Sequence, residues 1–173
     1  MTIAVAHARE TGAGCLPVRF ESLTLLPFAA LLPLDEEELL HRGARRFVVP
    51  DNPGIGYPCR VSLAFARAGE EVLLVNHRHL DLATTPYRAE GPVFVRKNAQ
   101  PYTRVGDYPE IVMQREMAVR AYDAAGMMIE AELAAKSELI ALTEQWLGRG
   151  DVAHVDYHSA RRGCFFCRVR CAQ

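Results

Sequence analysis

The sequence predicts a single α+β domain with a mostly antiparallel sheet and two helices. The 173 residues are 50% hydrophobic, which at this length is enough for one hydrophobic core. Seven or eight short apolar or alternating segments are separated by turn residues, and two further segments carry helix caps. Strands and helices do not alternate regularly along the chain, so a parallel α/β sheet is not favoured.

Composition and charge exclude several classes of protein. A mean hydropathy of -0.03 and 24% charged residues do not fit a disordered chain, and no apolar run is long enough to span a membrane. A net charge of -1 argues against a nucleic-acid binder. Five cysteines, and Arg9 and Glu10 in place of an apolar signal core, predict a cytoplasmic protein. Residues 1–16 have no sustained period and are predicted as an N-terminal extension of the domain 17–173.

The first helix is predicted at 36–42 from its capping residues. Asp35 is a typical N-cap, and Glu38 stands three residues later as its capping-box partner. Gly43 supplies the stop. Strands are predicted on either side of this helix, at 18–23 and 45–49.

The strongest loop signal is the Pro- and Gly-rich stretch 50–58. It contains Gly54 and Gly56, but no Lys-Ser/Thr pair or helix follows, so a phosphate-binding P-loop is not supported. Apolar strands are predicted beyond it at 71–76 and 92–96. They flank a polar loop that contains His77, His79, Asp81, Tyr87 and Arg88.

The C-terminal half predicts a hairpin, a helix and two closing strands. The hairpin strands at 118–122 and 127–133 are joined by a four-residue turn, 123–126. Ser137 is predicted to cap the second helix, which Gly148 ends. The closing strands are expected at 152–158 and 164–169.

The strand 152–158 is the densest polar segment. Period two places His154, Asp156 and His158 on one face of it. The two histidines lie about 13 Å apart at the strand rise, so zinc would need Asp156, one of these histidines and ligands from elsewhere, such as His79 or a cysteine. The alternative is a polar strand face whose imidazoles hydrogen-bond to neighbours.

The last cysteines include one Cys-x-x-Cys pair, Cys164 and Cys167. A structural zinc needs four ligands, and these two positions point to opposite faces of an extended strand. Cys167 and Cys171 are therefore predicted as buried, unreactive thiols. Cys164 differs because it follows Arg161-Arg162-Gly163, and nearby guanidinium groups lower the pKa of a thiol.

Arginine dominates the basic residues, since only two of the 20 are lysine. A guanidinium group is matched in shape to carboxylate and phosphate, although salt bridges within the scaffold are the alternative role. The leading hypothesis is a site for a small anionic molecule without a cofactor. Its binding residues are Arg60, Arg88, Arg120, Arg161, Arg162, Tyr87 and His79. If the site is catalytic, His158 is the candidate acid or base and Cys164 the candidate nucleophile.

Four segments resemble a known family. They are Pro58–Leu63, Thr85–Ala89, Arg120–Asp123 with Gly126 and Met127, and the segment from His158 to Phe165. Together they are similar to the bacterial family called domain of unknown function 1203, over roughly Arg19 to Arg170. The resemblance implies a small cytoplasmic bacterial protein with no assigned activity, and it supplies no catalytic residues.

Two alternatives to the anion site stay open. One is a zinc-binding protein that uses Asp156 and His154 or His158. The other is a non-catalytic homodimeric interaction module, in which arginine clusters pair with acidic residues of the partner.

Overall fold

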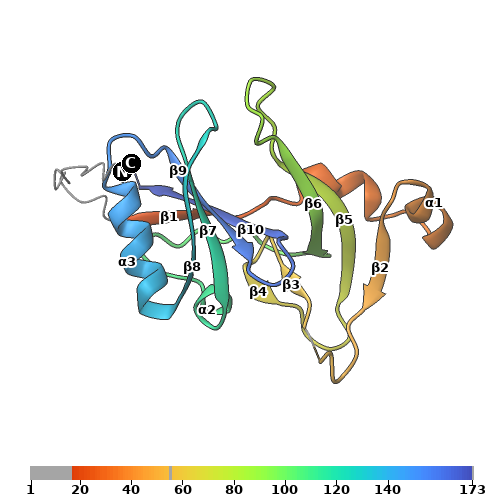
Figure 1. Ribbon diagram of the computed structural model, residues 1–173. Helices are drawn as coiled ribbons and strands as arrows, with labels where there is room; N and C mark the ends of the chain where they lie inside the picture. Colours follow the sequence, from red (N-terminus) through yellow and green to blue (C-terminus); the bar gives the residue numbers. More distant parts are fainter. Residues whose placement is uncertain (1–16, 55, 173) are drawn as a thin grey trace.

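Residues 17–54 and 56–172 of the computed structural model form two five-stranded sheets (Figure 1). The strand orders are β1-β10-β9-β7-β8 and β2-β5-β6-β3-β4, which we call sheet A and sheet B. Among the described strands, every pairing is antiparallel except that of β3 with β6. The predicted α+β fold with a mostly antiparallel sheet is thus confirmed. The predicted extension 1–16 lies outside the described residues.

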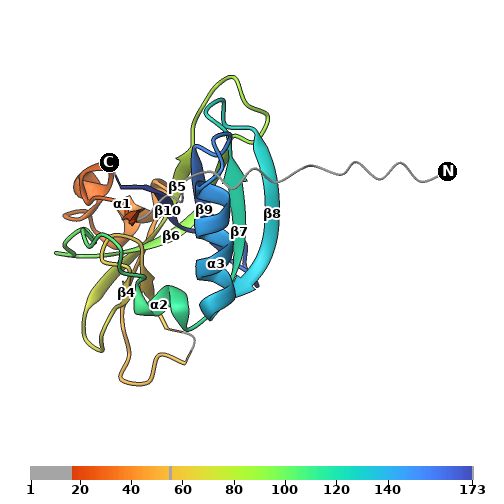
Figure 2. The same cartoon turned by 90° about the vertical axis from the view of Figure 1, so that its left-hand side faces the viewer.

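Sheet A contains the two ends of the described chain. Its strands are β1 (Val18–Glu21), β7 (Glu116–Tyr122), β8 (Met128–Ala135), β9 (His154–Ser159) and β10 (Phe165–Cys171). Figure 2 shows α3 (Lys136–Leu147) lying across one face of this sheet. Leu139, Trp146 and Leu147 of α3 pack there against Tyr157 and Phe166 of the strands.

Sheet B is formed by the middle of the chain. Its strands are β2 (Arg45–Val48), β3 (Pro58–Cys59), β4 (Ala64–Phe65), β5 (Glu71–Leu80) and β6 (Ala89–Arg96). The 3-10 helix η1 (Leu26–Leu31) and α1 (Glu36–His41) cover one face through Phe28 and Leu39. The short α2 (Glu110–Met113) comes just before β7.

Helices and strands form at both predicted helical segments and at all eight predicted strand segments, with shifted ends, but the described residues contain four helices in place of the two predicted. The capping box forms, because the N–H of Glu38 donates to Asp35 Oδ1 at 2.9 Å and the N–H of Asp35 to Glu38 Oε2 at 3.1 Å. The second helix begins at Lys136, so Ser137 lies inside it and is not its N-cap.

Some elements differ from the prediction. The sequence did not predict η1, α2, β3 and β4. The strand expected at 71–76 continues to Leu80, so His77 and His79 lie in β5 and not in a loop. His77 pairs with Gly91 of β6, whereas His79 lies at a bulge between the paired residues Arg78 and Leu80. No helix within the described segments is long and apolar enough to cross a membrane.

A buried pair of hydroxyl groups joins α3 to sheet A. Thr143 Oγ1 donates to the carbonyl of Leu139 at 2.7 Å and lies against the hydroxyl of Tyr157. A threonine hydroxyl has a single proton, and that proton is given to the carbonyl. The Tyr157 hydroxyl must therefore be the donor to Thr143, and Thr143 is its acceptor in the core.

This direction of donation predicts unequal effects of two substitutions. Tyr157→Phe removes one donor and leaves Thr143 bonded to Leu139, so we expect a loss of about 1 kcal/mol in the free energy of unfolding. Thr143→Val leaves the Tyr157 hydroxyl buried without an acceptor and should cost more, about 2–3 kcal/mol. Urea unfolding of both variants measures the difference. An equal or smaller loss in Thr143→Val would contradict the assignment.

Candidate functional site

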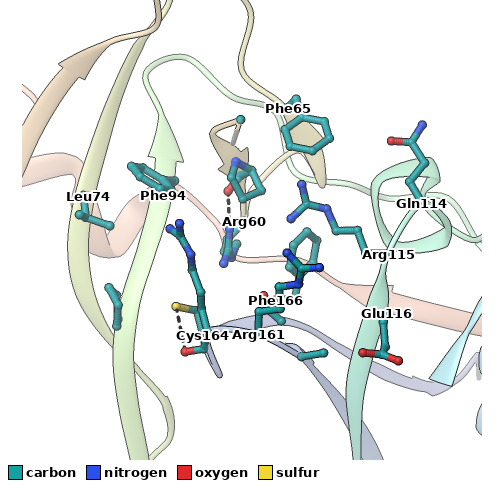
Figure 3. A pocket seen from close by; sticks show the side chains of 16 residues that line it. Arg60, Phe65, Leu74, Phe94, Gln114, Arg115, Glu116, Arg161, Cys164 and Phe166 are labelled. Atoms are coloured by element: carbon teal, nitrogen blue, oxygen red, sulfur yellow. Dashed lines mark hydrogen bonds between the residues drawn. The ribbon is translucent and has the colours of Figure 1, made fainter. Parts of the chain in front are cut away.

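A pocket of about 820 Å³ opens where the two sheets meet. Sheet B contributes residues of β3, β4, β5 and β6, and sheet A contributes the turn between β9 and β10 and the segment that enters β7. Figure 3 shows Leu74 and Phe94 on one side of the pocket, Arg115 and Glu116 on the other, and Arg60 between them.

Arg60 follows directly after β3 and is almost completely buried, at 3% exposure. Its Nε donates to the carbonyl of Phe165 at 2.8 Å, and its Nη1 donates to the carbonyl of Pro58. The guanidinium carbon lies 4.6 Å from the centre of the Phe166 ring. Burial lowers the pKa of Arg60 to about 10, while nearby cysteines, chiefly Cys164, act in the opposite direction. Arg60 therefore remains a fixed cation at neutral pH.

Three more arginines line the same pocket. The guanidinium carbon of Arg115 lies 4.6 Å from the centre of the Phe65 ring, and partial burial lowers the pKa of this arginine. Arg161 and Arg162 are exposed in the turn between β9 and β10. Within residues 17–54 and 56–172, none of these four arginines forms an ion pair with a carboxylate.

Glu116 is the one acidic residue among the described residues that line the pocket. Four guanidinium groups and one carboxylate leave an excess of positive charge there. The pocket can therefore attract anions.

The β9–β10 turn presents backbone donors beside its two arginines. The N–H of Ser159 donates to Cys164 O at 2.9 Å, and the N–H of Gly163 donates to Ser159 O at 2.8 Å. Gly163 has φ +70°, a left-handed conformation that glycine adopts without strain. In the described part of the chain, the N–H groups of residues 160–162 donate no hydrogen bond, which leaves them available to a ligand.

Cys164 ends this turn and is partly exposed in the pocket. Its Sγ lies 3.8 Å from the carbonyl of Arg162, to which it donates. Cys167 is buried, as predicted, and burial raises the pKa of its thiol far above the usual range. Cys171 is exposed at the end of β10 and is disulfide-bonded, so the prediction of a buried thiol is wrong there.

A second polar group lies on the face of sheet A that points away from α3, and we call it the buried polar face. His154, Asp156 and His158 are all buried there, and their neighbours in β9, Val155 and Tyr157, pack in the core beneath α3. The shared face predicted for the three residues is thus confirmed.

The carboxylate of Asp156 forms an ion pair with Arg168. Nε and Nη2 of Arg168 donate to its two carboxylate oxygens at 2.7 and 2.9 Å. Nη2 of Arg168 also donates to the carbonyl of His79 at 3.2 Å, which ties β10 to β5 of the other sheet. The carboxylate is therefore occupied by an arginine of the scaffold.

His158 packs against His79 and Phe165. The His79 ring stacks on Phe165 with centroids 4.6 Å apart, and it meets the His158 ring edge-on at 5.1 Å. Nδ1 of His158 lies 3.0 Å from the carbonyl of Gly163, which can only accept. Nδ1 therefore carries the proton. Nε2 is left as a buried acceptor without a partner in the described structure.

Burial also decides the charge of these histidines. It lowers the pKa of His158 and His154 to about 3 and that of His79 to about 4. The positive charge of Arg168 acts in the same direction on all three, and that of Arg120 acts on His79 and His158. All three imidazoles are neutral at pH 7.

The structure divides the predicted site residues among three places. Arg60, Arg161, Arg162 and Cys164 line the pocket. His79, His158 and Arg120 belong to the buried polar face, on the other side of the β9–β10 turn. Two residues lie elsewhere: Tyr87 meets Tyr122 edge-on at 6.3 Å, and Arg88 forms an exposed ion pair with Asp81 at 2.7 Å.

Sequence reasoning missed Arg115 and the aromatic residues Phe65, Phe94 and Phe166 of the pocket. No local motif marks any of them, because they meet only through long-range packing. As to metals, no group of three or more His, Cys, Asp or Glu residues is arranged to hold an ion in the part of the chain that the structure describes.

The neutral histidines predict a loss of stability in acid. Their pKa is depressed in the folded state, so the unfolded chain binds more protons once the pH falls below about 6.5. Their contribution is complete above that pH and is lost progressively toward pH 3. We expect roughly 1–2 kcal/mol of lost unfolding free energy for each buried histidine between pH 7 and pH 5.

Urea unfolding across this pH range measures the effect in the native protein and in His158→Gln. The variant should depend less steeply on pH. His41→Gln, which removes an exposed histidine of α1, is the matched control and should leave the slope unchanged. Parallel curves for the native protein and His158→Gln would refute this explanation.

Comparison with known proteins confirms the resemblance noted in the sequence. Residues 56–171 match the family model described as "Protein of unknown function (DUF1203)". The match begins later than the expected Arg19, yet it contains every described residue that lines the pocket. Neither the curated proteins nor the solved structures gave a match. The match spans more than half of the chain, and the protein therefore belongs to the DUF1203 family.

Proposed function

We propose that this protein binds a small anion, a carboxylate or a phosphate, in the pocket between its two sheets. The observation that supports this proposal is the set of four pocket arginines that pair with no carboxylate among the described residues. By contrast, the partly buried Arg46, Arg96 and Arg168 each pair with an acidic side chain.

Arg60 is the pocket arginine that most needs a counter-charge, because it is almost completely buried. Placing a cation in the protein interior is costly unless it is hydrogen-bonded and paired. Two of its nitrogens are satisfied by carbonyl oxygens, which fix the group but do not neutralise it. Nη2 has no hydrogen-bond partner in the described residues, and a bound anion would supply both a partner and a counter-charge.

The proposal is limited to binding. Nucleophilic catalysis needs the nucleophile and its base within hydrogen-bond reach. Nδ1 of His158 is engaged with Gly163, and Sγ of Cys164 is directed to the Arg162 carbonyl. Zinc binding and homodimer formation stay predictions of the sequence.

Inorganic phosphate and acetate, titrated at constant ionic strength and followed by thermal unfolding, test the proposal. We expect a saturable rise in Tm with the native protein. The double variant Arg161→Gln/Arg162→Gln should raise the apparent Kd at least about tenfold, because it removes two charged donors.

The matched control is Arg42→Gln/Arg45→Gln. It removes the same charge from two exposed arginines outside the pocket that form no ion pair in the described segments. This control should bind as the native protein does. Equal weakening in both double variants would show a general effect of net charge and would refute a site in the pocket.

A further inference from the structure

We infer that the natural ligand of this pocket is an organic anion with a planar apolar body, such as an aryl carboxylate or an aryl phosphate, and not a bare inorganic ion. The inference rests on the proposed function and specifies the chemical class of the ligand. The size of the pocket, its aromatic walls and the uneven distribution of charge around it carry the argument.

The pocket is too large for a bare ion. Its volume of about 820 Å³ compares with about 30 Å³ for a single water molecule in the liquid. Organic ligands of moderate size occupy pockets of roughly 300–1,000 Å³. An isolated phosphate or acetate would leave most of this space to water.

The walls that face the arginines are apolar. Leu74 of β5, Pro92 and Phe94 of β6, and Phe65 of β4 all line the pocket. Phe65 is 36% exposed and is not part of the hydrophobic core clusters of the described residues. A ligand with an apolar body would remove this surface from water, which is favourable in proportion to the area buried.

The aromatic rings of the pocket are held in fixed positions. Phe94 meets Tyr57 edge-on at 5.1 Å and Phe47 at 6.2 Å. Arg115 lies over Phe65, as Arg60 lies over Phe166. Rings held by their neighbours in this way can contact a second planar group with little loss of conformational freedom.

Three of the four pocket arginines and most of the apolar wall come from different sheets, whereas Arg60 follows β3 of sheet B and Phe65 of sheet B lies beside Arg115. Arg115, Arg161 and Arg162 come from the elements of sheet A, whereas Leu74, Pro92 and Phe94 come from the strands of sheet B. Figure 3 shows this separation for Arg115 on one side and for Leu74 and Phe94 on the other. A ligand that satisfies both sides at once needs an anionic head and an apolar body on the same molecule.

Three probes separate the two requirements by isothermal titration calorimetry: acetate, 2-naphthoate and the neutral 2-naphthamide. We expect 2-naphthoate to bind at least about tenfold more tightly than acetate, because its rings cover the apolar wall. We expect 2-naphthamide to bind at least about tenfold more weakly than 2-naphthoate, because it lacks the charge that the arginines attract.

Variants locate the apolar contact. Phe94→Ala should weaken 2-naphthoate about tenfold and leave acetate binding unchanged. Leu74→Ser serves the same purpose if Phe94→Ala does not fold. Tyr87→Ala, which removes an exposed aromatic ring that does not line the pocket, is the control and should bind both probes as the native protein does.

The outcomes distinguish this inference from the proposed function. Equal affinity for acetate and 2-naphthoate would overturn the inference and leave anion binding intact. Equal affinity for 2-naphthoate and 2-naphthamide would show an apolar site that ignores charge, and would overturn both. If none of the three probes binds, both the inference and the proposed function are overturned.

Discussion

The hydrogen bond from Arg60 to the carbonyl of Phe165 is the contact on which the site depends. It joins two residues that are 105 positions apart in the chain, one following β3 in sheet B and the other beginning β10 in sheet A. The same guanidinium lies over Phe166, the next residue of β10. One side chain thereby joins the two sheets at the pocket and also supplies the buried charge of the pocket.

The β9–β10 turn separates an open environment that accommodates charged side chains from an enclosed one that disfavours them. On one side Arg161 and Arg162 stand in the open pocket, where water or a ligand can balance their charge. On the other side His158 is enclosed and neutral, since burial and neighbouring arginines disfavour its protonated form. Only the short stretch from Ser159 to Cys164 lies between the two.

Local patterns predicted the elements well, and long-range packing limited the prediction of the site. The capping box at Asp35 and the alternation in β9 depend on neighbours in sequence, and both are confirmed. The sequence predicts a loop at the polar end of β5 because His79 is polar, yet the ring of His79 is covered by Phe165 from a distant strand. Arg115 has no neighbouring motif at all. It enters the pocket because Phe65 and β7 come together in the folded chain.

Phe165 couples the pocket to the buried polar face through a single residue. Its carbonyl is held by Arg60, whereas its ring stacks on His79. The carbonyl of Gly163, two residues earlier, fixes the tautomer of His158 and so decides which of its nitrogens is left without a partner. A shift of this hairpin would change the position of the Arg60 charge and the packing of both histidines together. The neutral, tightly packed histidines thus help to hold in place the turn that presents Arg161 and Arg162 to the pocket.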